Sequence, residues 1–269
     1  MIDFIQGEKF VQLADYIYFY NRKGTEFNIY TNTFNIDKLQ DNDLIYAHTH
    51  HVEYLFNELN NTNKKIILIS HNSDYNICDE PHKNVIKWYS QNVKFKSDRI
   101  ESIPIGLENN RWFKDIDKKS KMINKLNENK NHKNLLYINH HIDTNRKERL
   151  KPYEIFKNLS WVNLEYGANG TNFENYLDNI YNHKFVICPE GNGIDTHRTW
   201  ECLYLNTIPI EKININNQFY TDLPICFVNE WEDITQDFLE KEYIRINNNN
   251  NWNMDKLLFN YWEKKLKIR

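Results

Sequence analysis

The chain has 269 residues, enough for one large domain or for two domains of about 130 residues each. Apolar residues make up 40% and charged residues 26%, which is the balance of a folded globular protein and excludes a disordered chain. The net charge of −3 gives no overall electrostatic reason to bind nucleic acid or an acidic membrane, so we expect no nucleic-acid partner and only a local anion site.

No segment predicts export or a membrane span. The N-terminal stretch MIDFIQGEKFVQ has too short an apolar run for a secretory signal, and no stretch reaches the roughly 18 apolar residues of a membrane span. The four cysteines lack the spacing of metal ligands, which favours buried thiols over disulfides; they are Cys78, Cys188, Cys202 and Cys226. We therefore expect a cytoplasmic protein with no integral membrane segment.

The first half of the chain predicts strands alternating with helices. The expected strands are 42–50, 64–74 and 99–108, and the expected helices are 52–60 and 82–93. The stretch 114–133 is nearly all charged or amide and lacks a sustained apolar face, so we expect a partly helical linker there. This divides the chain into domains 1–130 and 131–269.

The second half repeats the alternation more clearly. The expected strands are 134–141, 161–167, 184–191, 207–211 and 224–231, the expected helices are 149–159, 172–183, 195–206, 216–223 and 235–244, and 252–268 is expected as a closing helix. Such alternation is typical of parallel sheets covered by helices on both faces. We predict an α/β protein with two facing Rossmann-like domains, whose ligands bind at the carboxyl ends of the strands, between the halves.

The stretch PEGNGIDTHRTWE, residues 189–201, follows one of these strands and has the composition of an anion site. Gly191 and Gly193 allow close approach or positive φ, and a helix beginning at residue 195 or 196 would present free N–H groups and a partial positive charge. Arg198 adds a fork of donors that suits phosphate oxygens. Glu201, on the same side of that helix, could accept from ribose hydroxyls. The simpler interpretation is an Arg198–Glu201 pair on a solvated helix face.

Several strings together carry a family resemblance. FVICPEGNGIDTHRTWECLYLNTIPI resembles the nucleotide-sugar signature of exostosin-like glycosyltransferases, and the likeness extends to LLYINHHIDTNRKER, NLEYG, WYSQNV and SIPIGLENNRW. The resemblance implies the GT-B fold, with the donor nucleotide held by the C-terminal domain. It also implies a transferase that moves a sugar from a nucleotide-diphosphate donor to a hydroxyl of a glycan or other acceptor, with inversion and without a metal or cofactor.

Roles for individual residues follow from this resemblance. Arg198 would hold the diphosphate and Glu201 the ribose. The remaining donor-binding positions are Gly191, Asn192, Gly193, Asp195, Thr196 and His197 in the glycine loop and Asn145, Arg146 and Arg149 after the first strand of this half.

The base that deprotonates the acceptor is expected at strand ends of the first domain. HTHH at 48–51 and SHNSD at 70–74 each follow an apolar run. From the histidines and the one carboxylate of these strings we single out His50 and Asp74, because an imidazole titrates near neutral pH and a positioned carboxylate can accept a proton.

Two other functions stay open at this point. His48 and His50, two apart at a strand end, resemble the HxH of amidohydrolase-type metal sites, which His71 and Asp74 would complete around Zn²⁺. A non-catalytic nucleotide or sugar-binding module is the second alternative. Against the hydrolase, such enzymes usually need an eight-fold barrel, and the Arg198 and Glu201 motif would have no role in one. For the transferase, no Asp-x-Asp stands at a strand end to hold Mn²⁺ or Mg²⁺, since Asp41-Asn42-Asp43 has the character of a turn.

Overall fold

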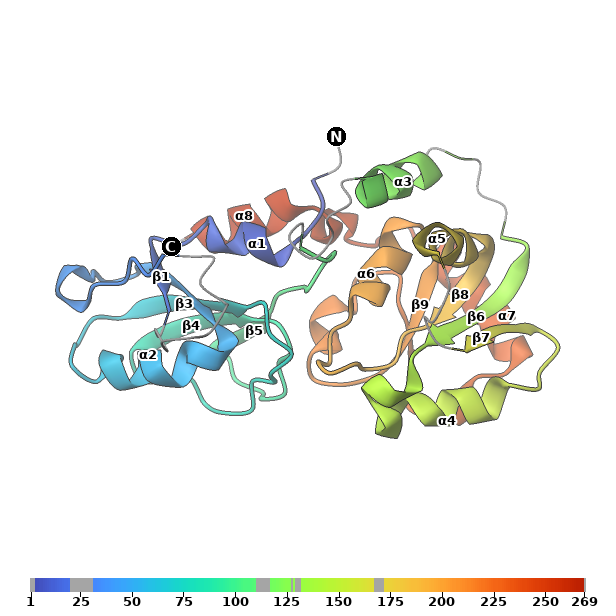
Figure 1. The fold of residues 1–269 in the computed structure, drawn as a ribbon, viewed down its shortest axis with the longest axis horizontal. Helices are drawn as coiled ribbons and strands as arrows, with labels where there is room; N and C mark the ends of the chain where they lie inside the picture. Colours follow the sequence, from blue (N-terminus) through green and yellow to red (C-terminus); the bar gives the residue numbers. More distant parts are fainter. Residues whose placement is uncertain are drawn as a thin grey trace.

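The chain folds into two α/β lobes, each built on a five-stranded, all-parallel sheet, consistent with a Rossmann-like pair (Figure 1). The computed structural model describes residues 3–19, 31–109, 117–126, 128, 132–166 and 172–268. The predicted fold class is confirmed in its two parallel sheets and its C-terminal helix. The predicted domain boundary near residue 130 lies outside the described residues. Within the described ranges, no helix has the length and apolarity to cross a membrane.

The first sheet has its strands side by side in chain order, β1-β2-β3-β4-β5. The strands are β1 (Tyr16–Tyr18), β2 (Leu44–His48), β3 (Ile66–His71), β4 (Val85–Ser90) and β5 (Ile100–Ser102). The helical elements of this part are α1 (Gly7–Val11), η1 (Ile36–Lys38), η2 (Thr49–His51) and α2 (Val52–Leu59). Each strand continues the sheet in the same direction, so this order contains no reversal.

The two faces of the first sheet have different covers because side chains alternate along each strand. Ile45 and Leu68 belong to a core shared with α2. Tyr46 and Ile69 belong to a second core, which α1 and the C-terminal helix α8 (Phe259–Lys267) complete. Figure 1 shows α1 and α8 together over one face and α2 below the other.

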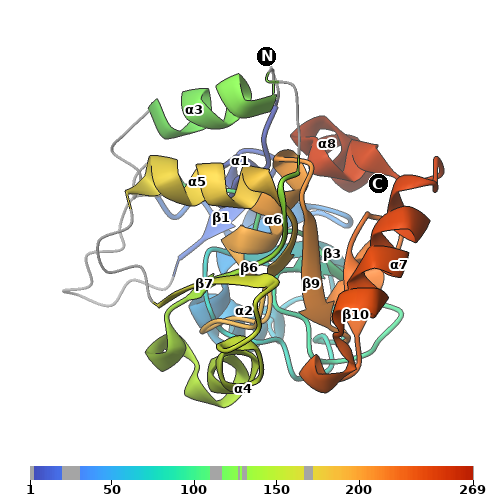
Figure 2. The same ribbon diagram turned by 90° about the vertical axis from the view of Figure 1, so that its right-hand side faces the viewer.

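The second sheet has the order β10-β9-β8-β6-β7, so its chain order reverses between β6 and β8. The strands are β6 (Asn134–His140), β7 (Val162–Tyr166), β8 (His183–Ile187), β9 (Ile208–Lys212) and β10 (Cys226–Val228). The helical elements are η3 (Ile142–Thr144), α4 (Arg146–Phe156), α5 (Phe173–Asn182), α6 (His197–Tyr204), η4 (Asn217–Tyr220), η5 (Trp231–Asp233), α7 (Gln236–Asn247) and η6 (Met254–Leu257). Helices α5 and α6 cover one face and α4 and α7 the other (Figure 2).

The carboxyl edges of the two sheets face each other. The side-chain oxygen of Asn216, after β9, accepts a hydrogen bond from the backbone N–H of Val93, after β4 (2.9 Å). It also accepts one from the hydroxyl of Ser102, at the end of β5 (2.8 Å). The predicted meeting of the strand ends between the halves is therefore present.

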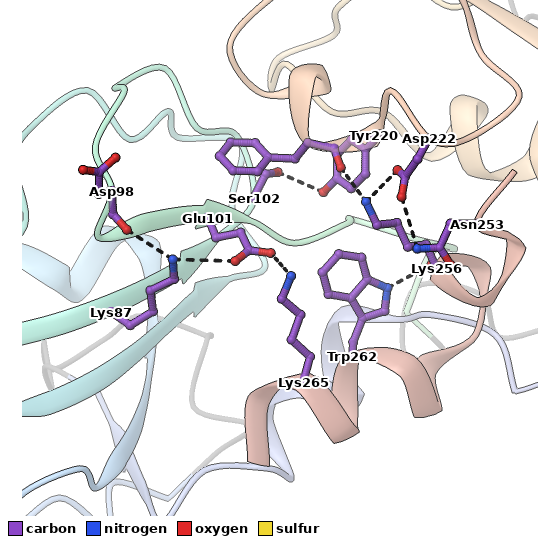
Figure 3. Close-up of polar contacts among 11 residues, drawn as sticks. Lys87, Asp98, Glu101, Ser102, Tyr220, Asp222, Asn253, Lys256, Trp262 and Lys265 are labelled. Atoms are coloured by element: carbon purple, nitrogen blue, oxygen red, sulfur yellow. Dashed lines mark hydrogen bonds and ion pairs between the residues drawn. The ribbon is translucent and has the colours of Figure 1, made fainter. Parts of the chain in front are cut away.

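Helix α8 connects the two lobes, as expected for a closing helix. Lys265 of α8 forms an ion pair with Glu101 of β5, which also faces Lys87 of β4 (3.6 Å) (Figure 3). Just before α8, Lys256 pairs with Asp222 of the second lobe (2.6 Å). The C-terminal segment thus forms one ion pair with each lobe.

One predicted helix is wrong. Residues 82–93 contain strand β4, paired in parallel with β3 and β5. Its sequence VIKWYS is rich in β-branched and aromatic side chains, which suit a central strand, and this outweighed the apparent helical spacing. No helix connects β3 to β4; residues 72–84, all described, form an irregular loop with a single isolated β-bridge at Ile77.

The stretch predicted as a linker contains helix α3 (Asp117–Leu126), which packs on the second lobe. Met122 is buried, and Lys121 and Lys125 pair with Glu174 and Asp178 of α5. The rest of that stretch, at 114–116, 127 and 129–131, lies outside the described residues, as do residues 110–112 of the string SIPIGLENNRW and Gly167 of NLEYG.

Candidate functional site

The chain order of the second sheet reverses between β6 and β8, which marks one position at its carboxyl edge. In open parallel sheets, ligands bind where the chain order reverses, because the connections leave the two neighbouring strands toward opposite faces. His140 ends β6, and the segment 188–196 joins β8 to α6. The predicted helix start at residue 195 or 196 is close: Thr196 is the N-cap and α6 begins at His197.

Two arginines meet at this position. Arg149 of α4 donates from Nε to the carbonyl of Glu190 (2.9 Å) and from Nη1 to the carbonyl of His141 (3.1 Å). The guanidinium carbon of Arg198, in α6, lies 5.6 Å from the centre of the Tyr176 ring. Among the described residues, no carboxylate lies within 4.0 Å of either guanidinium. Burial and the charge of Arg198 lower the pKa of Arg149 to about 10, so the two cations repel each other across the site.

Three buried polar atoms here have no hydrogen-bond partner among the described residues: Arg198 Nη1, Thr196 Oγ1 and His140 Nδ1. His140 Nε2 faces the carbonyl of Arg149 (2.8 Å) and must carry the proton, which leaves Nδ1 as an acceptor. Burial and the two arginines lower the pKa of His140 to about 3, so its ring is neutral. Because buried polar groups nearly always have partners, these atoms indicate a ligand or ordered water.

Glu201 lies beside this group and is buried, at 7% exposure. One carboxylate oxygen accepts the hydroxyl of Tyr176 (2.6 Å), and no ion pair joins Glu201 to Arg198 within 4.0 Å. Burial and the charge of Glu201 raise the pKa of Tyr176 well above its usual value, so Tyr176 remains a donor. The simpler interpretation, an exposed Arg198–Glu201 pair, does not describe this arrangement.

Asp195 connects the glycine loop to the first lobe. Its backbone N–H donates to the side chain of Asn92 (2.9 Å), and its carboxylate accepts from Ile105 N–H (2.7 Å) and from the indole of Trp200 (2.9 Å). Burial raises the pKa of Asp195 to about 6. The backbone N–H of Asp195, which the sequence predicted to bind a phosphate, instead donates to Asn92 of the first lobe.

The two loop glycines lie close to side chains of other segments. A Cβ on Gly193 would lie 2.7 Å from the side chain of Asn92, and one on Gly191 would lie 2.9 Å from the guanidinium of Arg149. Neither glycine has a positive φ. Of the two possibilities that the sequence raised, the structure has close approach.

The other predicted donor residues divide into two groups. Asn145 caps α4 and donates to the carbonyl of Gly191 (2.8 Å), which joins the two loops at the reversal. Arg146 is exposed and paired with Asp143 (3.3 Å), and Asn192 is exposed. The reversal thus gathers Asn145, but not the side chains of Arg146 and Asn192.

The proposed bases lie at the edge of the first sheet. His50 stacks on His48 with ring centroids 4.8 Å apart and contacts Tyr75 edge-on (4.0 Å). Burial lowers the pKa of His50, and the charge of nearby Asp74, which is exposed, acts in the opposite direction. The rings of His48 and His51 are also close to each other, with centroids 5.7 Å apart. In the described ranges, no three His, Cys, Asp or Glu side chains group so as to hold a metal ion.

The cysteines are all free thiols, three of them buried and Cys78 exposed. Cys78 therefore departs from the prediction of buried thiols. It lies in the irregular loop before β4, where its neighbour Ile77 is buried and Cys78 is exposed.

In comparisons with known proteins, no family model and no curated protein matches the chain. The class that the fold defines is an α/β protein with two all-parallel sheets whose carboxyl edges meet. Because such folds serve many chemistries, a function has to be argued from the site itself.

Sequence reasoning missed three residues of the site: His140, Tyr176 and Glu190. His140 ends a predicted strand, so its position at the carboxyl edge could have indicated it. Tyr176 sits on the expected helix 172–183, and nothing in its spacing shows that it meets Glu201. Glu190 offers a backbone carbonyl to Arg149, a role that no side-chain pattern can reveal.

Proposed function

We propose that the protein is a glycosyltransferase of the GT-B type, which moves a sugar from a nucleotide-diphosphate donor to a hydroxyl of a glycan or other acceptor. The observation that carries the proposal is the pair of guanidiniums at the strand-order reversal, with Arg198 Nη1 buried and unpartnered. A diphosphate would satisfy that N–H and neutralise both cations.

The chemistry of transfer requires this charge. As the bond from the sugar to the diphosphate breaks, negative charge grows on the leaving phosphate, and donors fixed beforehand stabilise it. Arg198 and Arg149 supply positive charge of the kind that a metal ion supplies in other phosphate sites, which supports a metal-independent mechanism. The resemblance of 185–210 to exostosin-like transferases points to the same donor and to inversion.

The nucleoside end of the donor is assigned to Glu201 in this proposal. Tyr176 occupies one carboxylate oxygen of Glu201, and the second is available to accept from a ribose hydroxyl. Asn145 holds the loop at Gly191 in place behind the phosphates. The acceptor hydroxyl would lose its proton at the facing edge of the first sheet, where the sequence puts forward His50 and Asp74.

A panel of nucleotide sugars tests the proposal. Binding of UDP, GDP and ADP is measured by calorimetry, and release of the diphosphate from the corresponding sugars is measured with and without simple alcohols and glycans. We expect one nucleoside diphosphate to bind and its sugar to be turned over. Binding without any turnover would favour the alternative of a nucleotide or sugar-binding module, and the absence of binding to all three would reject the donor assignment.

A further inference from the structure

A small polar cavity lies between the lobes, at the carboxyl end of β3. Its volume is about 80 Å³, room for two or three waters at roughly 30 Å³ each. The polar side chains that line it include His71, Asn72, Gln91, Glu108, Asn109 and His197. Neither His50 nor Asp74 lines this cavity. It has the size and polarity for a hydroxyl or hydroxymethyl group rather than for a whole sugar.

The first-lobe wall of the cavity is held rigidly. Asn72 has a left-handed backbone (φ 61°), and its N–H donates to Gln91 Oε1 (2.9 Å). Its side chain donates to the hydroxyl of Tyr46 (2.8 Å) and accepts from Asn109 (2.9 Å). A Cβ on Gly7 would lie 2.0 Å from Asn72 Oδ1, so the chain also closes tightly behind it. These bonds fix the wall before any ligand arrives.

The second-lobe wall is His197, which faces Glu108. His197 Nδ1 lies 2.7 Å from the carbonyl of Gly106 and must carry a proton, because a carbonyl oxygen only accepts. Nε2 therefore faces the carboxylate of Glu108 (3.4 Å), whose other oxygen accepts from Asn109 N–H (3.0 Å). An imidazole nitrogen and a carboxylate oxygen opposite each other can share one proton. Both side chains are about one-third exposed, toward the cavity.

We propose that Glu108 and His197, in place of His50 and Asp74, form the proton acceptor of the transfer, and that the cavity takes the reacting hydroxyl. This rests on the proposed function. The acceptor oxygen forms a bond to the anomeric carbon as the bond from that carbon to the diphosphate breaks. The hydroxyl proton moves to His197 Nε2, the electron pair of the broken bond leaves on the diphosphate, and the carboxylate of Glu108 stabilises the imidazolium.

The order of residues in α6 fits this assignment. His197 and Arg198 are adjacent in its first turn, so one helix positions the proton acceptor and the proposed diphosphate ligand. His71 and Asp195 also interact electrostatically with His197. His71 is fully buried with a pKa lowered to about 4 by burial, so it is neutral and does not compete for the proton.

The test uses Glu108→Gln and His197→Asn in the full-length protein. Asparagine can still donate to the carbonyl of Gly106 but has no atom at the position of Nε2. Positioned proton transfer contributes roughly 100-fold to 10,000-fold, so kcat should fall at least 100-fold in each variant. Affinity for the nucleoside diphosphate, measured by calorimetry, should stay within threefold, and the melting temperature reports folding. Glu80→Gln and His82→Gln, which lie outside the cavity, are the matched controls.

The outcomes separate this inference from the proposed function. Turnover by the wild type together with near-normal kcat in both folded variants overturns the assignment of Glu108 and His197, while the transferase stands. Loss of kcat in His50→Ala or Asp74→Asn instead would return the base to those residues. A wild type that neither binds nor turns over any nucleotide sugar overturns both.

Discussion

The two sheets have the same number of strands and the same parallel direction, but they differ in strand order. The first runs β1 to β5 without reversal, whereas the second reverses between β6 and β8. Only the second therefore has the strand-order reversal at which ligands bind in open α/β sheets, and two arginines gather there with three buried polar atoms that have no partner among the described residues. Such atoms also occur in the loops after β2 and β3 of the first sheet, on Thr49, His51 and Asn76, so it is the pair of arginines that distinguishes the second lobe. The first sheet instead presents histidines, amides and Glu108 at the facing edge. In our proposals the second lobe binds the anion, and the proton moves to His197 of that lobe, which faces Glu108 of the first.

The largest effect is expected from removing the cation at the reversal. Arg198→Ala should abolish measurable nucleoside-diphosphate binding and lower turnover at least 100-fold, because loss of one well-placed donor typically costs roughly 3 kcal/mol. Arg146→Ala is the matched control, since Arg146 lies in the neighbouring α4 but is exposed and paired with Asp143. Calorimetry and steady-state turnover on both variants check the prediction. Near-normal turnover in Arg198→Ala would remove the assignment of the donor site.

The next effect concerns α8, which covers the first sheet and also contacts the second lobe. Trp262 of α8 is 1% exposed, and its indole donates to the carbonyl of Lys256 (2.9 Å). Trp262→Ala should lower the free energy of unfolding by about 3–5 kcal/mol, as a large cavity in a packed core does. Ile268→Ala, at a position 82% exposed, should change it by less than about 0.5 kcal/mol. Equal effects of the two substitutions in urea unfolding would show that α8 does not close the first lobe.

The third effect is a pH dependence of stability that comes from a carboxyl group of the second lobe. Burial raises the pKa of Glu211 from 4.5 to about 7, although its carboxylate accepts hydrogen bonds from Thr199 and Asn217. The folded state thus holds this proton more tightly than the unfolded state, so its contribution to stability is full below pH 4.5 and is lost as pH rises through about 7.

Glu211→Gln removes that titration. The melting temperature of the wild type should fall relative to that of the variant between pH 4.5 and about 7, measured by scanning calorimetry. Parallel curves for the two proteins across this range would contradict the raised pKa.

The sequence predicted the second sheet better than the first, for a physical reason. The strands β6 and β8 contain short apolar runs typical of buried parallel strands, and a predicted helix follows each of them. Strand β4 alternates irregularly between buried and exposed side chains and follows β3 without a helix, which hid its type. The short elements α1 and β1 were not predicted, because they depend on contacts with residues distant in the sequence. Strand β1, for example, pairs with β2, and Tyr16 lies opposite Ile45.

The site was predictable in its charges but not in its connections. Arg198 and the two glycines follow from local spacing after β8. The contacts of Asp195 with Ile105 and of His197 with Gly106 in the first lobe could not be predicted in this way. These partners lie about 90 positions away in the chain. Glu108 enters the site by the same long-range contact, so no local motif could indicate it.

The most direct test of the central claim is a crystal structure of the protein with the nucleoside diphosphate that binds best in the panel. The account predicts that the diphosphate lies at the reversal between β6 and β8, with a phosphate oxygen within hydrogen-bond distance of Arg198 Nη1 and the second guanidinium, Arg149, beside it. A diphosphate bound at the carboxyl edge of the first sheet, or at a surface remote from α6, would contradict it.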